Sequence, residues 1–392
     1  MMEHTNALKL QRVEELKNKF NKLYNKKAEF NFIAPARINL IGEHIDYNGG
    51  HVLPACVSLY LTVFVSKRDD NKIRLYSTSF DKLEEFDINN FEKSNNSSWT
   101  DYIKGAIFVL NKHGVSLDCG LDLLYDSTIP VGSSLSSSAA LLDVTLYMMS
   151  SIFNLNISRK DIALFAKEVE NNYLDLSCGI MDQAIIALGK ENTAMLLDCA
   201  KFEYNYVALE LNDYRFVILN TNRERKLTES KYNERVSECN KGLSLIKEKY
   251  NVSNLCELNP SNLEDLKELI NDELIYKRVK HVISEEDRVN RFACALSNGD
   301  IESLGKILNE SHESLKKLYE VSGFYLDTIV EEAMNAGAIG ARMTGAGFSG
   351  CAIALIDKDI FNEFKRKVEE NYYKKTNLKC DVIITDIVGG VK

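Results

Sequence analysis

The stretch from Ala34 to Ala55, which reads APARINLIGEHIDYNGGHVLPA, constrains the fold of this chain more than any other segment. Its apolar residues predict a buried strand that runs into a polar turn. Gly49 and Gly50 follow Asn48 and can supply the positive φ angles that such a turn needs. On structural grounds alone, the segment is a strand that enters a tight turn.

Four polar residues of the same stretch are not explained by that turn, namely Arg37, Glu43, His44 and Asp46. Two carboxylates, an imidazole and the turn amides offer several acceptors and donors within a short span. Such a set suits a ligand that carries many hydroxyl groups. Because polar residues on loops held by strands are often site residues, we interpret this stretch as a candidate binding site.

Length and charge limit the classes of function. A chain of 392 residues is expected to form two or three domains. Its net charge of -9 argues against nonspecific nucleic-acid binding, and no Lys/Arg cluster stands beside aromatic residues. The sequence has no 18-residue apolar window and no apolar signal-peptide core, so we expect a cytoplasmic protein that does not span a membrane.

Nine cysteines are scattered along the chain and never form a C-x-x-C pair. This pattern predicts reduced thiols, most of them buried, in a cytosolic protein. The six histidines show no metal-ligand spacing either, so we do not expect a zinc site.

The first part of the chain is predicted to be mainly β after one helix. Residues 6–24 carry apolar side chains at steps of three and four, which is typical of a surface helix. Residues 57–65 alternate and predict a strand, with residues 72–77 as its hairpin partner. A helix over 99–114 and a short strand over 121–125 are predicted next.

Residues 130–140, PVGSSLSSSAA, form a loop rich in glycine and serine that opens a helix predicted to run through residues 141–153. The first amides of a helix are unpaired and lie at the positive end of its dipole, so such a loop can bind phosphates. A serine N-cap is the structural alternative, but it does not explain five serines in six positions. The Walker A pattern is absent, which indicates a phosphate loop of another kind.

Asp182 stands at the predicted start of a helix that includes residues 184–188, after a helix over 159–174 that carries Glu168 and Glu170. Taken alone, Asp182 is best explained as an N-cap, because Asp fills that position well. A catalytic carboxylate is the alternative interpretation.

The second half is predicted to be mainly helical. A composition change over residues 200–212 suggests a domain boundary, which gives domains 1–210 and 211–392. The predicted elements around and after it are strands over 194–198, 206–211 and 216–220, and helices over 228–250, 276–297, 301–319 and 326–336.

Residues 340–351, GARMTGAGFSGC, contain a G-x-G-x-x-G pattern at Gly345, Gly347 and Gly350. The dinucleotide fingerprint requires a helix after these glycines, whereas residues 351–356 predict a strand. We therefore interpret the glycines as a close approach of backbone amides to a ligand between two strands.

The motifs ARINLIGEHIDYNGGHVLP, PVGSSLSSSAAL and GARMTGAGFSGC, in this order, resemble those of the GHMP small-molecule kinase superfamily, and the first resembles its galactokinase branch. CGIMDQ, NTNRERKLTESKYNERVSEC and NESHESLKKLYEVS are similar to the same branch, so the resemblance spans roughly residues 15–390. It implies an α+β, two-domain GHMP kinase fold with the active site in the interdomain cleft. It further implies transfer of the γ-phosphoryl of ATP to the anomeric hydroxyl of α-D-galactose, with Mg²⁺.

The resemblance also implies roles for individual residues. Asp182 would be the catalytic carboxylate and Arg37 its cationic partner, with Asp182 as a base or as an orienting charge. The remaining implied residues are Glu43, His44, Asp46, Gly179 and Tyr232 on the sugar; Gly132, Ser133, Ser134, Leu135, Ser136, Ser137, Ser138, Ala139 and Ser77 on ATP; and Ser138 and Glu170 on Mg²⁺.

The chain departs from the family pattern at four positions. Ser134 and Ser349 stand where glycine is usual, Leu142 where an acidic residue is usual, and Asp175 where glycine is common. Two alternatives to a galactokinase follow, an N-acetylgalactosamine kinase and a sensor that binds galactose and ATP without turnover. Because residues 136–139 are intact, a kinase is favoured over the sensor. The resemblance weakly suggests a monomer.

Overall fold

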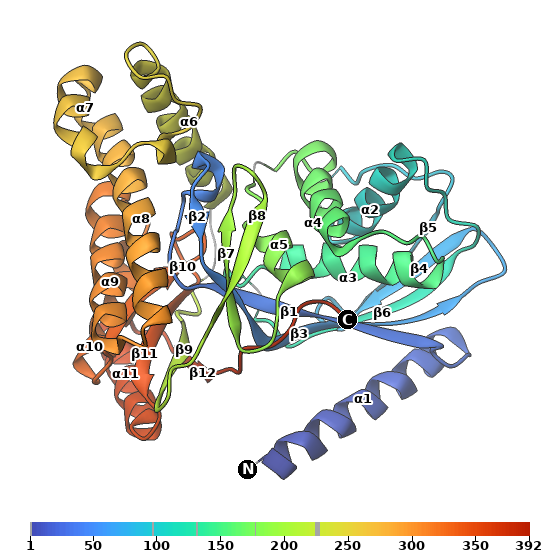
Figure 1. The fold of residues 1–392 in the computed structure, drawn as a ribbon. Coiled ribbons are helices and arrows are strands. Elements are labelled where there is room, and N and C mark those ends of the chain that lie inside the picture. The colour runs from blue at the N-terminus through green and yellow to red at the C-terminus, as the bar shows by residue number, and fades with distance from the viewer. Residues whose placement is uncertain (1, 96–97, 131, 177, 224–227) are drawn as a thin grey trace.

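The computed structural model describes residues 2–95, 98–130, 132–176, 178–223 and 228–392 (Figure 1). Two residues of the motifs above, Val131 and Ser177, lie outside this part of the chain. The fold is α+β, as the sequence predicts.

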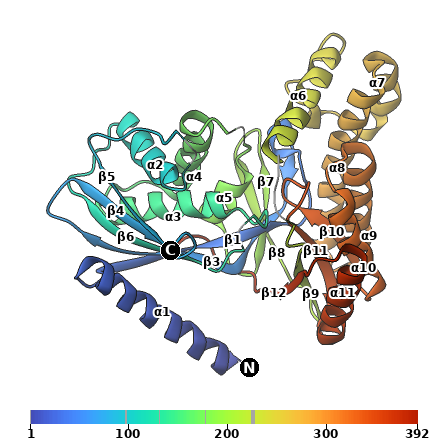
Figure 2. The same ribbon diagram turned by 180° about the vertical axis from the view of Figure 1, so that it is seen from behind.

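A five-stranded sheet with the order β1-β3-β6-β4-β5 is the framework of the first half. Helices α2, α3, α4 and α5 cover one of its faces and α1 lies against the other (Figures 1 and 2). The strands are β1 (Phe30–Asn39), β3 (Pro54–Lys67), β4 (Lys72–Ser77), β5 (Lys82–Asp87) and β6 (Leu121–Ser127), and the helices are α1 (Met2–Tyr24), α2 (Thr100–Lys112), α3 (Ser137–Ile152), α4 (Arg159–Glu168) and α5 (Met181–Leu188).

The predicted first helix packs against the sheet through its apolar stripe. Phe20 and Tyr24 of α1 join Phe64 and Leu124 in a small core that is separate from the main one. The Tyr24 hydroxyl also donates a 2.6 Å hydrogen bond to the carbonyl of Leu123. This face of the sheet is therefore closed by a single helix.

The predicted hairpin between residues 57–65 and 72–77 is wrong. β6 lies between β3 and β4, antiparallel to the first and parallel to the second. Leu123 of β6 faces the main core and Leu124 faces the core under α1, so this strand is buried on both faces. A strand that is apolar on both sides takes a central place in the sheet, which the local alternation of its neighbours does not reveal.

The second half places long helices beside a four-stranded sheet with the order β10-β11-β9-β12. The helices stand together at one side of the molecule in both views (Figures 1 and 2). The strands are β9 (Tyr214–Asn220), β10 (Gly340–Thr344), β11 (Cys351–Asp357) and β12 (Asp381–Ile384), and the helices are α6 (Thr228–Ile246), α7 (Leu263–Ile270), α8 (Glu273–Ser297), α9 (Ile301–Ser314), α10 (Gly323–Asn335) and α11 (Phe361–Thr376).

Two helices end in a wider π-helical turn. α4 continues into the π-turn Val169–Tyr173, and α9 continues into the π-turn Leu315–Tyr319. Such turns shift the side chains that follow by one position relative to an α-helix, and they are frequent at functional sites. Here the first π-turn contains Glu170 and the second ends at Tyr319.

A third sheet and the last residues of the chain join the two halves. β2 (His51–Val52), β7 (Thr193–Asp198) and β8 (Glu203–Ala208) form a three-stranded sheet. After β12 the chain returns to the first half, where Lys392 exchanges two backbone hydrogen bonds with Ile33 and Val388 donates to the carbonyl of Cys56. The proposed boundary near residue 210 is therefore crossed again by residues 386–392.

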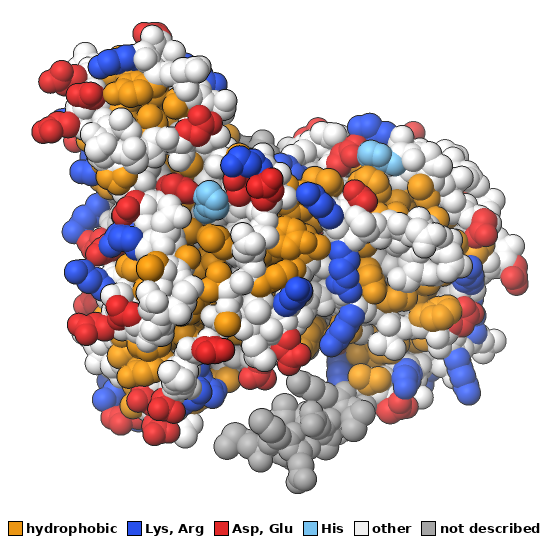
Figure 3. Space-filling model, in the orientation of Figure 1, with side chains coloured by type: hydrophobic (Ala, Val, Ile, Leu, Met, Phe, Trp, Pro, Cys, Tyr) orange, Lys and Arg blue, Asp and Glu red, His pale blue; other side chains and the backbone are white. Residues whose placement is uncertain are grey.

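The visible surface carries acidic and basic side chains in alternation rather than one extended basic area (Figure 3). The nine cysteines all lie in the described ranges and carry thiols rather than disulfides. Only four of them are buried, namely Cys56, Cys239, Cys351 and Cys380, so the prediction that most are buried is wrong. Within the described ranges, no helix combines the length and the apolar character that crossing a membrane requires.

Candidate active site

A cavity of about 430 Å³ lies between the two halves and gathers most of the predicted site residues. Gly345, Ala346, Tyr232 and Asn233 of the second half form one part of its wall. The predicted residues that line it are Arg37, Glu43, His44, Asp46, Gly132, Ser133, Ser134, Ser136, Ser137, Ser138, Glu170, Gly179, Asp182 and Tyr232.

Arg37 and Asp182 form a bidentate ion pair in this wall. Nε and Nη2 of Arg37 donate to the two carboxylate oxygens of Asp182 at 2.7 and 2.8 Å. Nη1 of Arg37 donates to the carbonyl of Ser134 at 2.7 Å, and the hydroxyl of Ser136 donates to Asp182. The pair and the phosphate loop are thus tied into one rigid unit.

The electrostatics of Arg37 follow from this pairing. Burial by itself would lower the pKa of Arg37, but the charge and hydrogen bonds of Asp182 outweigh it and the pKa is raised. The guanidinium, whose side chain is only 5% exposed, is a permanent positive charge at the cavity.

The N-cap interpretation of Asp182 is wrong. α5 begins at Met181 with Ile180 as its N-cap, so Asp182 lies inside the first turn. Its side chain points to Arg37 and not to a free backbone amide of its own helix. The alternative role, a carboxylate placed in a site, fits this geometry.

The phosphate loop turns through left-handed backbone angles before α3 begins at Ser137. Gly132, Ser134 and Ser136 have φ of 71°, 63° and 62°. These angles bring the loop around so that the start of α3 faces the cavity, where unpaired amides attract anions.

The third motif packs directly against this loop, between the two predicted strands β10 and β11. A Cβ on Gly345 would lie 2.8 Å from the carbonyl oxygen of Ser134, and one on Gly350 would lie 2.9 Å from Ser134 Cβ. The two glycines therefore make room for the Ser134 side chain. This serine, which stands where the family usually has glycine, is accommodated beside these two glycines.

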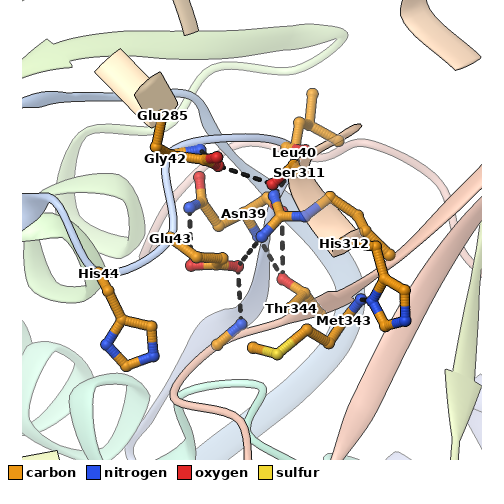
Figure 4. A network of polar contacts seen from close by, with 12 residues as sticks. Asn39, Leu40, Gly42, Glu43, His44, Glu285, Ser311, His312, Met343 and Thr344 are labelled. Atoms are coloured by element: carbon orange, nitrogen blue, oxygen red, sulfur yellow. Dashed lines mark hydrogen bonds and ion pairs between the residues drawn. The ribbon is translucent and has the colours of Figure 1, made fainter. Parts of the chain in front are cut away.

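Glu43 is held from both halves of the molecule (Figure 4). Its Oε2 accepts from Asn39 at 2.9 Å, and its Oε1 accepts from the backbone amide of Gly345 at 2.8 Å. Arg342, which is fully buried, pairs with the same Oε1 at 3.0 Å. The carboxylate is fixed before any ligand arrives.

The buried carboxylate of Glu285 on α8 accepts a hydrogen bond from the turn that precedes Glu43. Glu285 accepts hydrogen bonds from the amide of Gly42 at 3.1 Å and from the Ser311 hydroxyl at 2.8 Å, as Figure 4 shows. The ion pair with Arg288 at 2.7 Å keeps the carboxylate charged, and the pKa of Glu285 is lowered to about 2 although burial would raise it. The first motif thus depends on side chains of the second half.

Asp46 and Gly179 touch each other in the cavity. A Cβ on Gly179 would overlap the carboxylate of Asp46, with 2.5 Å to its carbon Cγ, so only glycine leaves room there. Burial, and next the nearby charge of Asp182, raises the pKa of Asp46 to about 7. A ligand hydroxyl that donates to Asp46 would favour its charged form.

His44 lies in the middle of the first motif with a left-handed φ of 65°. Its Nδ1 lies 2.9 Å from the hydroxyl of Tyr47 and its Nε2 lies 3.2 Å from the carbonyl of Ala346. Burial lowers the pKa of His44 to about 3, so the ring is neutral. Tyr232 stands beside it with a ring centroid distance of 5.7 Å.

Ser138 and Glu170 provide oxygen atoms near the phosphate loop. Glu170 accepts from Gln183 and from the Cys178 thiol, and burial raises its pKa although a Ser138 hydrogen bond opposes the effect. Oε1 of Gln183 is buried without a partner. An all-oxygen set with a spare acceptor fits Mg²⁺, which takes few protein ligands and keeps waters and phosphate oxygens.

Three predicted ATP residues do not line the cavity. Leu135 and Ala139 are buried in the core, although the Leu135 carbonyl accepts from the Arg37 amide. Ser77 is buried at the end of β4, where its hydroxyl accepts from the amide of Ser79.

Some residues that shape the site were not predicted. Asn39, Tyr47 and Gln183 lie inside quoted motifs, so their position in a motif was the available signal. Tyr319 lies inside the quoted run NESHESLKKLYEVS, although no role was predicted for it. Glu285 lies in ordinary helical sequence that nothing local marks.

Three protein-family models match the chain. The galactokinase galactose-binding signature matches residues 18–67, the GHMP kinases N terminal domain matches residues 101–190, and the GHMP kinases C terminal matches residues 292–374. The first model contains Glu43, His44 and Asp46, and the second contains Asp182 and the phosphate loop.

Full-length relatives and solved structures agree with these matches. The galactokinase of Clostridium acetobutylicum is 40% identical, with 97% of this chain and 98% of the relative covered. The structure of Lactococcus lactis galactokinase complexed with galactose is 39% identical, with a TM-score of 0.94 and coverage of 97% and 99%. The Methanococcus jannaschii mevalonate kinase shares the fold, with a TM-score of 0.67, 20% identity and coverage of 92% and 98%. The chain belongs to the galactokinase family of the GHMP kinases.

Proposed function

We propose that this chain transfers the γ-phosphoryl of MgATP to the anomeric hydroxyl of α-D-galactose, which gives α-D-galactose 1-phosphate and ADP. The observation that carries the proposal is the Arg37–Asp182 pair, bonded at 2.7 and 2.8 Å between the phosphate loop and the carboxylate Asp46 in one cavity. Membership of the galactokinase family supports the choice of sugar.

The sugar would lie on the side of the cavity formed by the first motif. Asp46 and Glu43 supply acceptors for its hydroxyls, and Oε2 of Glu43 has one protein partner, which leaves room for a second. The rings of Tyr232 and His44, with centroids 5.7 Å apart, also line the cavity, as does Gly179. This set matches a small ligand with several hydroxyl groups.

The nucleotide phosphates would lie at the start of α3. The loop from Gly132 to Ser138 presents serine hydroxyls and the first amides of the helix, which suit bound phosphate. Glu170 and Ser138 would hold Mg²⁺ there, and this ion, when bound, reduces the negative charge on the phosphates.

The reaction needs an aligned hydroxyl and compensation of charge on the moving phosphoryl group. Asp182 would accept a hydrogen bond, or the proton, from the anomeric hydroxyl in place of the one that Ser136 donates now. Arg37 holds the carboxylate in position and adds a positive charge beside the phosphate path.

The test is ADP release from MgATP with galactose, N-acetylgalactosamine, glucose or no sugar in parallel. We expect turnover with galactose well above the other three. Preferred turnover of N-acetylgalactosamine would replace galactose as the substrate. If galactose and ATP raise the melting temperature but no sugar is turned over, the chain is a sensor and the proposed activity is wrong.

A further inference from the structure

A chain of four polar side chains, of which His44, Cys239 and Tyr319 are buried and Tyr47 is partly buried, leads into the sugar side of the cavity. The Cys239 thiol lies 3.1 Å from the hydroxyl of Tyr319, which lies 2.8 Å from the hydroxyl of Tyr47. The Tyr47 hydroxyl in turn lies 2.9 Å from Nδ1 of His44. We name these four residues the hydroxyl relay.

The His44 end of the hydroxyl relay determines which group donates in each of its hydrogen bonds. Nε2 of His44 faces the carbonyl oxygen of Ala346 at 3.2 Å, and a carbonyl can only accept, so Nε2 carries the hydrogen. Nδ1 of the neutral ring is then an acceptor, and Tyr47 must donate to it. Tyr319 must donate to Tyr47, and the Cys239 thiol to Tyr319.

The relay is assembled from three separate parts of the chain, since His44 lies in the same loop segment as Tyr47. Cys239 comes from α6, Tyr319 ends the π-turn after α9, and Tyr47 lies in the short helical turn Asp46–Asn48. Tyr319 is 0% and Cys239 1% exposed, so water does not compete for the hydrogen bond between them, whereas Tyr47 is partly buried. Neighbouring hydroxyls in such a setting polarise one another and favour one arrangement.

We propose that Tyr47 and Tyr319 are positioning residues that hold His44 as the neutral Nε2–H tautomer, so that the one ring N–H, which the Ala346 carbonyl accepts at 3.2 Å, can be shared with a hydroxyl oxygen of galactose. The inference rests on the proposed function, because it says how the protein fixes the tautomer of one residue that would contact the sugar. The other tautomer would direct a nitrogen lone pair at the Ala346 carbonyl and at the cavity. Acceptors are already supplied by Glu43 and Asp46, so a donor at this position completes the set.

The kinetic test compares Tyr47→Phe and Tyr319→Phe with the wild type. Tyr372→Phe is the matched control, because Tyr372 is also 0% exposed and donates to the carbonyl of Thr221 outside the cavity. We expect KM for galactose to rise about tenfold in Tyr47→Phe and less in Tyr319→Phe, with KM for ATP unchanged in both. Tyr372→Phe should lower the melting temperature comparably without changing either KM.

Variants of Cys239 distinguish a directed chain of hydrogen bonds from simple packing. Cys239→Ser keeps a donor to Tyr319 and should retain wild-type KM, whereas Cys239→Ala removes it and should resemble Tyr319→Phe. If all of these variants only lower the melting temperature, or if KM for ATP rises as much as KM for galactose, the proposal is wrong.

A spectroscopic arm needs no activity and separates this inference from the proposed function. Nitrogen-15 NMR of histidine-labelled protein, with His44→Gln to assign the signals, reports which ring nitrogen carries the hydrogen. We expect Nε2–H in the wild type and a changed Nδ1 signal in Tyr47→Phe. A wild-type ring that is Nδ1–H or doubly protonated would overturn the relay, even if the protein phosphorylates galactose. A confirmed Nε2–H ring with no galactose turnover would instead overturn only the proposed function.

Discussion

Replacing Gly179 by alanine should disable the sugar site while the fold stays intact. A Cβ at this position would overlap the carboxylate of Asp46 and lie 2.5 Å from its Cγ. Carbon atoms that are not bonded prefer a separation of about 3.5 Å, so the carboxylate must move by about 1 Å. The atom that has to move is the end of a side chain, and Gly179 does not have a positive φ, so the backbone can accept alanine.

The size of the effect follows from that displacement. A misplacement of about 1 Å in a positioned group can lower the rate about 100-fold, which corresponds to about 2.7 kcal/mol of transition-state stabilisation. We therefore expect kcat/KM for galactose to fall about 100-fold in Gly179→Ala. The free energy of unfolding should change by less than about 1 kcal/mol, because no core contact is lost.

The assay is ADP release at a range of galactose concentrations, together with thermal unfolding. Gly389→Ala is the control, since a Cβ there would meet nothing closer than 3.8 Å and should leave both measurements unchanged. The mechanism is tested by a double-mutant cycle with Asp46→Ala. If Gly179 acts through Asp46, the double variant will be no worse than Asp46→Ala. Additive losses, or full activity in Gly179→Ala, would refute the reasoning.

Three further predictions concern catalysis, strain and pH. Asp182→Asn should lower kcat at least about 100-fold while galactose still raises the melting temperature. Near-normal turnover would contradict the role of Asp182 as the catalytic carboxylate. Ser134→Gly should raise the free energy of unfolding by about 1 kcal/mol without loss of activity, because glycine adopts a φ of 63° without strain; a lower melting temperature would contradict this. The hydrogen bond to Glu286, 2.7 Å long, raises the pKa of His51. The stability from this pair is complete below the unfolded pKa of His51 and declines as pH rises through the folded pKa, so the melting temperature should fall between about pH 6 and pH 8 more in the wild type than in His51→Gln.

Local pattern was sufficient where the chain interacts with itself over short distances. The alternation at residues 57–65 predicted β3, and the serines before α3 predicted the phosphate loop, because period and capping are properties of neighbouring residues. The position of β6 between β3 and β4 could not be predicted in this way. Strand order depends on contacts between segments about fifty residues apart, for which one sequence has no local signal.

The site residues divide in the same way between those that a local motif identifies and those that only long-range contacts bring together. Arg37 and Asp182 were identified through their motifs, whereas the bidentate contact between them appears only in the folded chain. Glu285 was not predicted, since it occupies a helical position that looks like ordinary core, and Tyr319 was given no role although it lies in a quoted motif. They become part of the site only because α8 and the π-turn after α9 bring them next to the first motif.

The return of residues 386–392 to the first half has a consequence for how the chain folds. Ile33 obtains its hydrogen-bonding partner from Lys392, almost a whole chain length away. Closing so large a loop carries an entropic cost and raises the contact order, which slows folding. During synthesis the edge at β1 and β3 stays uncovered until residues 386–392 emerge from the ribosome. We expect a nascent chain that stops before residue 386 to be digested faster by protease at the first half than a chain that includes residues 386–392.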